Sequence, residues 1–265
     1  MSKIIKAPSL SGIFRLAFIG LLATVVASTM AYSEETYGDR LNMRAGEYNS
    51  NIQGIITGGV DGTYIQIGRD LGKLMSAKTD LRLMTLVGEG SSTNILDLLK
   101  RVGVDFAVVQ LDVIAAIEQD YLRNPEIAKL AYISKIYDEE IHLVGRSDAA
   151  PKSIMDLSGL RVNVGSNGSG TQVTSRLIFD FLDIEVEEVT MSNNDALEAL
   201  KAGEIDAMLF VAGRPAPLLS SVQASDQLAL LEIPFLPEIA GTYSRAEFEP
   251  QDYPGLGQGK FVPTI

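Results

Sequence analysis

The stretch RVNVGSNGSGTQVTSRLIFDFL, residues 161–182, decides the fold predicted for this chain. Its first part, Arg161–Gly165, is rich in valine and alternates in polarity, which predicts a short strand. Ser166–Gly170 contains two glycines, two serines and an asparagine, the composition of a turn. From Thr171 onward, apolar residues recur at helical spacing as far as Leu182. The stretch therefore predicts a strand, a glycine-rich turn and a helix, in that order.

Such a turn is a candidate anion site. The first N–H groups of a helix have no carbonyl partner within it, and the helix dipole makes that end positive. The side chains of Ser166, Asn167, Ser169 and Thr171 can add donors. The turn lacks the lysine of a phosphate-binding P-loop and the glycine order of a dinucleotide site. A plain connection between strand and helix is the alternative interpretation.

A glycine-rich turn before a predicted helix occurs at two other places in the chain. Gly58–Gly62 follows a predicted strand and precedes a helix that carries Tyr64, and Gly88–Gly90 precedes a helix beginning at Ser91 or Ser92. In open parallel sheets, sites lie at the carboxyl ends of strands, where all three turns are expected. We therefore predict that the three turns surround one cleft.

Strands and helices alternate along most of the chain. Predicted strands are Asn51–Thr57, Leu81–Val87, Val104–Gln110, Leu130–Tyr137, Ile141–Gly145, Arg161–Gly165, Val186–Met191, Ile205–Ala212 and Leu228–Ile233, with helices between them. Pro151–Gly159 is predicted to be one short helix, and Phe261–Ile265 to begin a strand. The alternation favours parallel sheets.

Two segments of the chain are similar in sequence, which indicates two similar halves. Leu98–Val109 and Ala199–Phe210 each consist of a helix end, a glycine and then Val/Ile-Asp opening an apolar strand. The expected organisation is a two-lobed α/β protein, with a first lobe of residues 51–138 and 240–265 and a second lobe of residues 139–239.

The N-terminus has the pattern of a secretory signal peptide, assigned to residues 1–33. Met1–Arg15 is basic, Leu16–Val26 is apolar, and small residues follow, so we expect cleavage after Ala31 or Ser33. An uncleaved anchor is the alternative, although the apolar run is short for one. Residues 34–50 are polar without periodicity and are predicted to form a linker.

Composition excludes several classes of function. The net charge of −12 makes nucleic acid an unsuitable general partner. There is no cysteine and only one histidine, His142, so the usual zinc sites and Ser-His-acid or Cys-His nucleophilic sites have no support. His142 lies in an apolar strand and is predicted to be a packed or inter-lobe residue. We expect neither a catalytic residue nor a metal or cofactor.

Several motifs together resemble one known family. Residues 57–71 (TGGVDGTYIQIGRDL), 90–94 (GSSTN), 105–112 (DFAVVQLD), 162–172 (VNVGSNGSGTQ) and 202–215 (AGEIDAMLFVAGRP) occur in the order found in the TAXI-type solute receptors of TRAP transporters. Departures from that pattern include Ile65, Gln66, Glu89 and Arg214. The resemblance covers residues 51–232.

The resemblance implies a two-lobed type II periplasmic binding protein fold. It implies an exported, periplasmic receptor, expected to be monomeric, for a small carboxylate such as glutamate, a related amino acid or 2-oxoglutarate. Its partner would be the membrane subunit of a TRAP transporter. Members of the family continue past the position of Ile265, so the sequence resembles a form truncated at its C-terminus.

The candidate ligand-binding residues come from the turns and from two strand ends. They are Gly59, Val60, Tyr64, Ser92, Asn94, Gln110, Asn167, Ser169, Gly170, Thr171, Gly213 and Arg214. Tyr64 can equally be a core aromatic, and Ser92 and Asn94 can be helix caps. Gln110 is predicted to face the cleft and Asp112 to cap a helix. Arg214 either clamps a carboxylate or is a solvated surface residue.

Two other functions remain open at this point. The same fold serves binding proteins of ABC importers and of sensor kinases, which the sequence hardly separates from a TRAP receptor. An exported enzyme on this fold is the third candidate, although no constellation of residues supports it.

Overall fold

The computed structural model describes residues 51–60, 62–121, 126–256 and 259–265. The predicted signal peptide, residues 1–33, and linker, residues 34–50, lie outside the described residues. Among the residues that the structure describes, no helix is both long and apolar enough to cross a bilayer.

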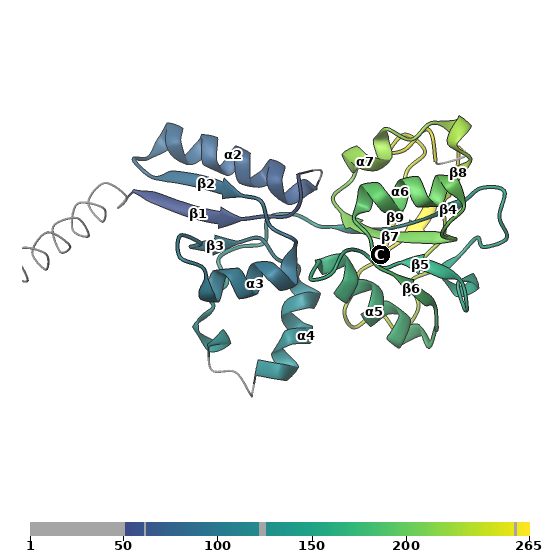
Figure 1. Cartoon of the computed structure of the whole chain (residues 1–265), viewed down its shortest axis with the longest axis horizontal. Helices are drawn as coiled ribbons and strands as arrows, with labels where there is room; N and C mark the ends of the chain where they lie inside the picture. Colours follow the sequence, from purple (N-terminus) through teal and green to yellow (C-terminus); the bar gives the residue numbers. More distant parts are fainter. Residues whose placement is uncertain (1–50, 61, 122–125, 257–258) are drawn as a thin grey trace, which may run out of the picture. The chain divides into compact units, whose positions relative to one another are not determined.

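The first sheet contains three strands, β1 (Ile52–Ile56), β2 (Arg82–Leu86) and β3 (Phe106–Ala107), in the order β2-β1-β3. β1 and β3 run parallel. The helices of this unit are α2 (Thr63–Lys78), α3 (Ser91–Lys100) and α4 (Leu111–Tyr121). Figure 1 shows α2 lying along β2.

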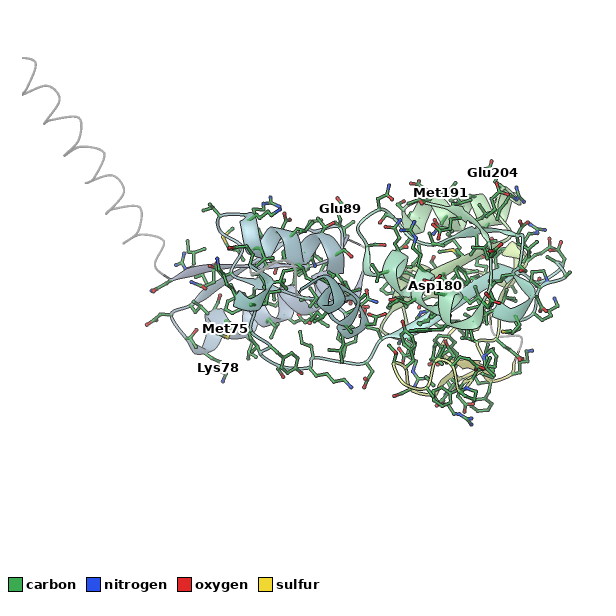
Figure 2. The ribbon with its side chains drawn as sticks, turned by 90° about the horizontal axis from the view of Figure 1, so that it is seen from below. Met75, Lys78, Glu89, Asp180, Met191 and Glu204 are labelled. Atoms are coloured by element: carbon green, nitrogen blue, oxygen red, sulfur yellow. The ribbon has the colours of Figure 1, made fainter. Side chains whose placement is uncertain are left out.

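Two glycines let α2 approach β2 closely. A Cβ on Gly68 would lie 2.7 Å from Cγ2 of Thr85, and one on Gly72 would lie 2.8 Å from the carbonyl oxygen of Leu83. Met75 and Lys78 lie near the far end of α2, whereas Glu89 lies at the opposite end of this unit, where α2 begins (Figure 2). The glycine-rich turns at residues 58–62 and 88–90 are therefore at the same end of the first sheet.

The second sheet has five strands in the order β6-β5-β7-β4-β8. They are β4 (Glu140–Arg146), β5 (Arg161–Asn163), β6 (Glu187–Val189), β7 (Ala207–Ala212) and β8 (Leu228–Leu230). β5 is parallel to β6 and β7, but β4 is antiparallel to both β7 and β8. The expectation of parallel sheets is therefore wrong for β4, which pairs with its neighbours in the opposite direction.

Helices cover both faces of the second sheet. Along β7, Met208, Phe210 and Ala212 belong to one hydrophobic cluster, and Ala207 and Leu209 belong to another. This alternation follows from the two-residue period of a strand. The first cluster includes residues of α6 (Asn193–Ala202), and the second includes residues of α5 (Gly170–Leu182). Figure 1 shows these two helices on either side of the sheet.

Several short elements belong to the second lobe, together with the five-stranded sheet. They are α7 (Pro217–Ser220), the 3₁₀ turns η2 (Ile154–Asp156) and η3 (Ala224–Asp226), and the antiparallel pair β9 (Ala246–Phe248) and β10 (Val262–Thr264). The predicted strand at residues 261–265 is thus confirmed in β10. The predicted helix over Pro151–Gly159 reduces to the single turn η2, capped by Ser153.

The C-terminal segment packs with the second sheet. Phe248, Tyr253 and Val262 are buried in the same cluster as Leu200 of α6, and the carbonyl of Ile265 accepts a hydrogen bond from the N–H of Ile141 over 2.9 Å. The assignment of residues 240–265 to the first lobe is therefore wrong. Their apolar side chains complete the core of the second lobe.

Two predicted strands differ from the structure. Leu130–Tyr137 contains no strand: after the 3₁₀ turn η1 (Ile127–Lys129), the chain is irregular through Glu139. Tyr132 and Ile133 are each 73% exposed, so the apolar pattern there reflects surface residues. Of Val104–Gln110, only Phe106 and Ala107 pair with a neighbouring strand. The α/β, two-lobed fold class is confirmed.

Candidate functional site

The helices that follow the first two glycine-rich turns begin without a side-chain cap. The N-cap of α2 is Gly62 and that of α3 is Gly90, and neither has a side chain to bond the first-turn N–H groups. Such groups have no carbonyl partner within their own helix. Both helices therefore present backbone donors at their positive ends, although in α3 the N–H of Thr93 is already paired with the carbonyl of Gly168.

The start of α3 contacts the turn that precedes α5. The N–H of Thr93 donates to the carbonyl of Gly168 over 3.2 Å, and the hydroxyl of Thr93 donates to the same oxygen over 3.3 Å. Gly90 has φ +120°, and a Cβ there would lie 3.1 Å from Cα of Ser169. Only glycine suits this backbone conformation and close approach. Two of the three glycine-rich turns, one from each lobe, therefore contact each other, and the cleft that all three were expected to surround stays a prediction.

Gln110 connects the two lobes through its amide. Its Oε1 accepts from the hydroxyl of Ser91 over 3.2 Å, and its Nε2 donates to Oγ1 of Thr174 on α5 over 2.9 Å. The N–H of Gln110 donates to Oγ of Ser91 over 2.9 Å. Gln110 thus lies in the contact between the lobes, and both ends of its amide are occupied, so its role in binding a ligand stays a prediction.

Asp112 makes a second connection between the lobes. Its Oδ2 accepts from the hydroxyls of Thr174 over 2.6 Å and of Tyr243 over 3.0 Å. Its Oδ1 accepts from the N–H of Val113 over 2.8 Å, near the start of α4. Asp112 is the second residue of α4, so its predicted role as a cap stays a prediction, whereas its carboxylate joins α4 to the second lobe.

Glu139 is a carboxyl group held between two tyrosines. The hydroxyl of Tyr64 donates to Oε2 over 2.9 Å, and that of Tyr137 donates to Oε1 over 2.8 Å. Burial raises the pKa of Glu139 to about 7, although both hydrogen bonds oppose that rise. The oxygen of Tyr64 also lies 3.4 Å from Oγ of Ser91. The hydroxyl of Tyr64 therefore lies between Glu139 and Ser91, the first residue of α3.

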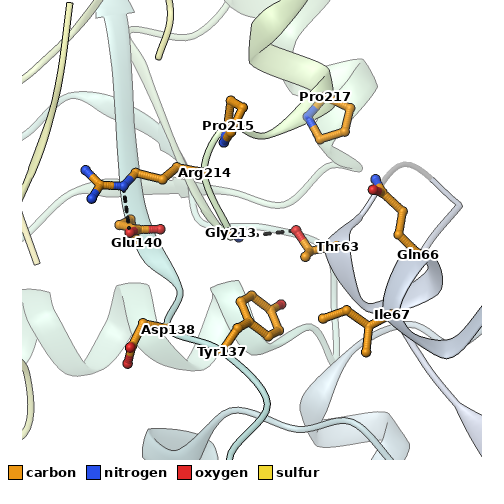
Figure 3. Close-up of a pocket in the computed structure, with 10 residues that line it drawn as sticks. All are labelled: Thr63, Gln66, Ile67, Tyr137, Asp138, Glu140, Gly213, Arg214, Pro215 and Pro217. Atoms are coloured by element: carbon orange, nitrogen blue, oxygen red, sulfur yellow. Dashed lines mark hydrogen bonds and ion pairs between the residues drawn. The ribbon is translucent and has the colours of Figure 1, made fainter. Parts of the chain in front are cut away.

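A pocket of about 440 Å³ lies beside this network (Figure 3). Residues of both lobes and of the segment between them line it, namely Thr63, Gln66, Ile67, Tyr137, Asp138, Glu140, Gly213, Arg214, Pro215 and Pro217. The N–H of Gly213 donates to the hydroxyl oxygen of Thr63 over 3.2 Å. The first residue of α2 therefore lies at the pocket.

Arg214 is already paired within the protein. Its Nε lies 3.1 Å from Oε1 of Glu140, and one Nη lies 3.7 Å from Oδ2 of Asp252 and donates to the carbonyl of Glu247. Figure 3 shows the guanidinium facing Glu140. Burial raises the pKa of Glu140, and Arg214 opposes this shift. Arg214 therefore lines the pocket, but this pairing occupies part of the guanidinium fork that would clamp a carboxylate.

The predicted ligand-binding residues differ in how exposed they are and in whether they line the pocket. Gly59, Val60 and Asn167 are exposed, and Ser92 is half-buried. Tyr64, Asn94, Ser169, Gly170 and Thr171 are buried. Only Gly213 and Arg214 line the 440 Å³ pocket.

Three of the buried predicted residues are engaged within their own lobes. Oγ of Ser169 accepts from the N–H of Gln172 over 3.1 Å and so caps α5. Oγ1 of Thr171 accepts from the N–H of Val211 over 3.2 Å. Asn94 donates to the carbonyl of Val108 over 2.9 Å. Their side chains thus have structural contacts, and their candidate role in binding a ligand stays a prediction.

Sequence reasoning missed Thr63, Tyr137 and Glu139. A signal for Glu139 was present, because two adjacent acids, Glu139 and Glu140, stand directly before a strongly apolar strand. Charged groups are rarely placed there without partners. The tyrosines that supply those partners come from separate segments, which a single sequence cannot bring together.

His142 is fully buried, as predicted for a packed residue. Its Nδ1 lies 3.0 Å and 3.2 Å from the carbonyl oxygens of Glu140 and Phe210, so this nitrogen carries the proton. Its Nε2 then accepts from the hydroxyl of Tyr253 over 2.6 Å. Burial lowers the pKa of His142 to about 4. Among the described residues, no group of three or more His, Cys, Asp or Glu side chains could hold a metal ion.

The family of the chain follows from its sequence match. Residues 55–241 match the NMT1-like family, and the chain belongs to that family. The match covers all of the second sheet, the first sheet except the start of β1, and each of the glycine-rich turns described above.

Solved structures with similar folds include proteins of different kinds. A regulatory domain of CcmR from Synechocystis has 14% identity and a TM-score of 0.41, with 70% of this chain and 82% of that chain covered. The aliphatic sulphonate binding protein SsuA from Escherichia coli has 14% identity and a TM-score of 0.45, with 68% and 56% covered. An ABC transporter periplasmic binding protein from Brucella ovis, with glutathione bound, has 14% identity and a TM-score of 0.49, with 74% and 61% covered. Values this low carry no argument about the ligand of this chain.

Proposed function

We propose that this chain is an exported solute-binding protein that captures a small carboxylate between its two lobes and delivers it to a TRAP-type membrane transporter. The ligand class is a glutamate-like amino acid or a dicarboxylate such as 2-oxoglutarate. Residues 1–33 would be removed on export to the periplasm.

One observation carries the proposal. The helices α2 and α3 both start behind a glycine N-cap, and their first residues, Thr63 and Ser91, lie where the lobes meet. Because uncapped helix N-termini attract anions, a carboxylate placed there would be stabilised by backbone donors. It would touch both lobes and so favour their closed arrangement.

The size of the pocket supports a small ligand. A volume of about 440 Å³ is in the usual range for small-molecule sites, although at its lower end. The lining offers neutral polar groups from Thr63 and Gln66 and the ion pair of Glu140 with Arg214. Such a lining can bind the polar groups of an amino acid or keto acid without a further cofactor.

Delivery to a TRAP transporter rests on the motif resemblance at residues 57–71 and 162–172. A thermal-shift and calorimetric screen of amino acids, keto acids and dicarboxylates tests the binding step. We expect at least one of these to raise the melting temperature and to bind one per chain. The absence of any hit with the folded protein would contradict the proposal. Reconstitution with the TRAP membrane subunit or with an ABC importer, each in proteoliposomes, would then separate the two routes of delivery.

A further inference from the structure

The carboxyl group of Glu139 lies beside the pocket, because it accepts a hydrogen bond from Tyr137, which lines the pocket, and the next residue, Glu140, lines it too. It sits in the segment between the two sheets, directly before β4, and Tyr64 binds it from the first turn of α2. The oxygen of the same hydroxyl lies 3.4 Å from Oγ of Ser91, which starts α3, while the protons of the two hydroxyls are donated to Glu139 and Gln110. A carboxyl group of the protein is therefore hydrogen-bonded both to the first turn of α2 and to a residue that lines the pocket.

We propose, on the basis of the function proposed above, that Glu139 sets the charge that the site accepts: a ligand carboxylate binds together with one proton, which Glu139 takes up. An ionised Glu139 would repel the negative charge of a ligand bound at the start of α2. A protonated Glu139 removes that repulsion and keeps both oxygens in contact with the tyrosine hydroxyls.

The surroundings of Glu139 favour the neutral form. The groups around it are the hydroxyls of Tyr64 and Tyr137 and the acidic side chains of Asp112 and Glu140. Burial is the largest cause of its raised pKa, and the two acids act in the same direction. Arg214, the cation nearest to this region among the pocket residues, is paired with Glu140. A second negative charge from a ligand would therefore raise the pKa of Glu139 further.

Calorimetry in buffers of different protonation enthalpy measures this proton directly. L-Glutamate and 2-oxoglutarate are titrated into the whole chain at pH 7.5 in PIPES, HEPES and Tris. We expect the observed enthalpy to vary with the buffer in the sense of proton uptake, by about half a proton or more per ligand. Glu139→Gln should remove this dependence and weaken the fall in affinity between pH 6 and pH 9.

Two further variants make the result decisive. Glu238→Gln removes one exposed negative charge elsewhere and should leave the proton uptake unchanged. Tyr137→Phe removes one hydrogen bond to the carboxylate, so the pH at which the affinity falls should move upward. This variant also tests the inference if Glu139→Gln fails to fold.

The outcomes separate the two proposals. Binding of either probe without buffer dependence, or with the same dependence in Glu139→Gln, would overturn the role of Glu139 and leave the solute-binding function intact. No binding of any carboxylate in the wider screen would contradict the function itself.

Discussion

A Cβ atom on Gly170 would lie 1.4 Å from Oε1 of Gln110, so the backbone at the start of α5 rests directly on this side chain. The amide of Gln110 is in turn fixed by Ser91 and Thr174. This contact joins the two lobes without an intervening side chain on Gly170. Glycine is therefore required at this position by the close approach of the lobes.

Gly170→Ala should separate the lobes locally. The methyl group would displace Gln110 and break its hydrogen bonds to Ser91 and Thr174, at a cost of about 1–3 kcal/mol in the free energy of unfolding. Denaturation in urea measures this loss. Gly241→Ala is the matched control, because a Cβ there would meet nothing within 4 Å. Equal stability of the two variants would show that the lobes do not depend on this contact.

Tyr243→Phe should weaken the connection made by Asp112. The hydroxyl of Tyr243 donates to this carboxylate, and hydrogen bonds to charged groups contribute about 1.5–3 kcal/mol. We expect a lower free energy of unfolding in urea. Tyr132→Phe, at a tyrosine that is 73% exposed, should change the stability by less than about 0.5 kcal/mol. A stability of Tyr243→Phe equal to that of the control would exclude this hydrogen bond as a stabilising contact.

The chain should lose stability as the pH falls from about 6.5 to 4, in part because of His142. This histidine is neutral in the folded protein, with a pKa of about 4, whereas the unfolded chain takes up a proton near pH 6.5. Because the unfolded state binds more protons in this window, stability decreases with falling pH, by an amount on the order of 3 kcal/mol. Melting temperatures of the wild type and His142→Gln measure it. A slope that is equally steep in the variant would contradict this assignment.

Glu139 should act in the opposite direction. Its pKa in the folded protein is about 7, above the ordinary value of 4.5, so its contribution to stability is present at low pH and is lost as the pH rises from about 4.5 to 7. Glu139→Gln should therefore gain stability relative to the wild type when measured at pH 8 rather than at pH 5. If the difference between the two proteins is the same at both values of pH, the raised pKa is wrong.

Periodicity predicted most of the second lobe. The strand at Arg161–Asn163, the helix at Gly170–Leu182 and the buried strand at Ala207–Ala212 follow from local patterns of apolar residues and glycines. The direction of β4 did not follow, because an apolar strand has the same pattern whether its neighbour is parallel or antiparallel. The packing of residues 240–265 on the second lobe also depends on contacts distant in sequence.

The site was predicted in part. The glycine-rich turns predicted helix N-termini around one cleft, and the structure brings two of these turns, at Gly90 and Ser169, close together. The side chains of Ser169 and Thr171 are used as a cap and as an acceptor for Val211, which turn composition does not distinguish from ligand binding. Glu139 was missed because its tyrosine partners become visible only in three dimensions.

The central claim is that the uncapped N-terminus of α2 binds the carboxylate of the ligand, and Thr63 allows it to be tested. Proline fits the first position of a helix and removes the N–H donor, whereas alanine keeps the donor, and both lose the hydroxyl of Thr63. We therefore propose to measure by calorimetry the affinity of Thr63→Pro and Thr63→Ala for the carboxylate identified in the screen. A dissociation constant about tenfold or more higher for proline than for alanine is the predicted result, the loss of a charge-assisted hydrogen bond. Equal affinities in two folded variants would contradict the account.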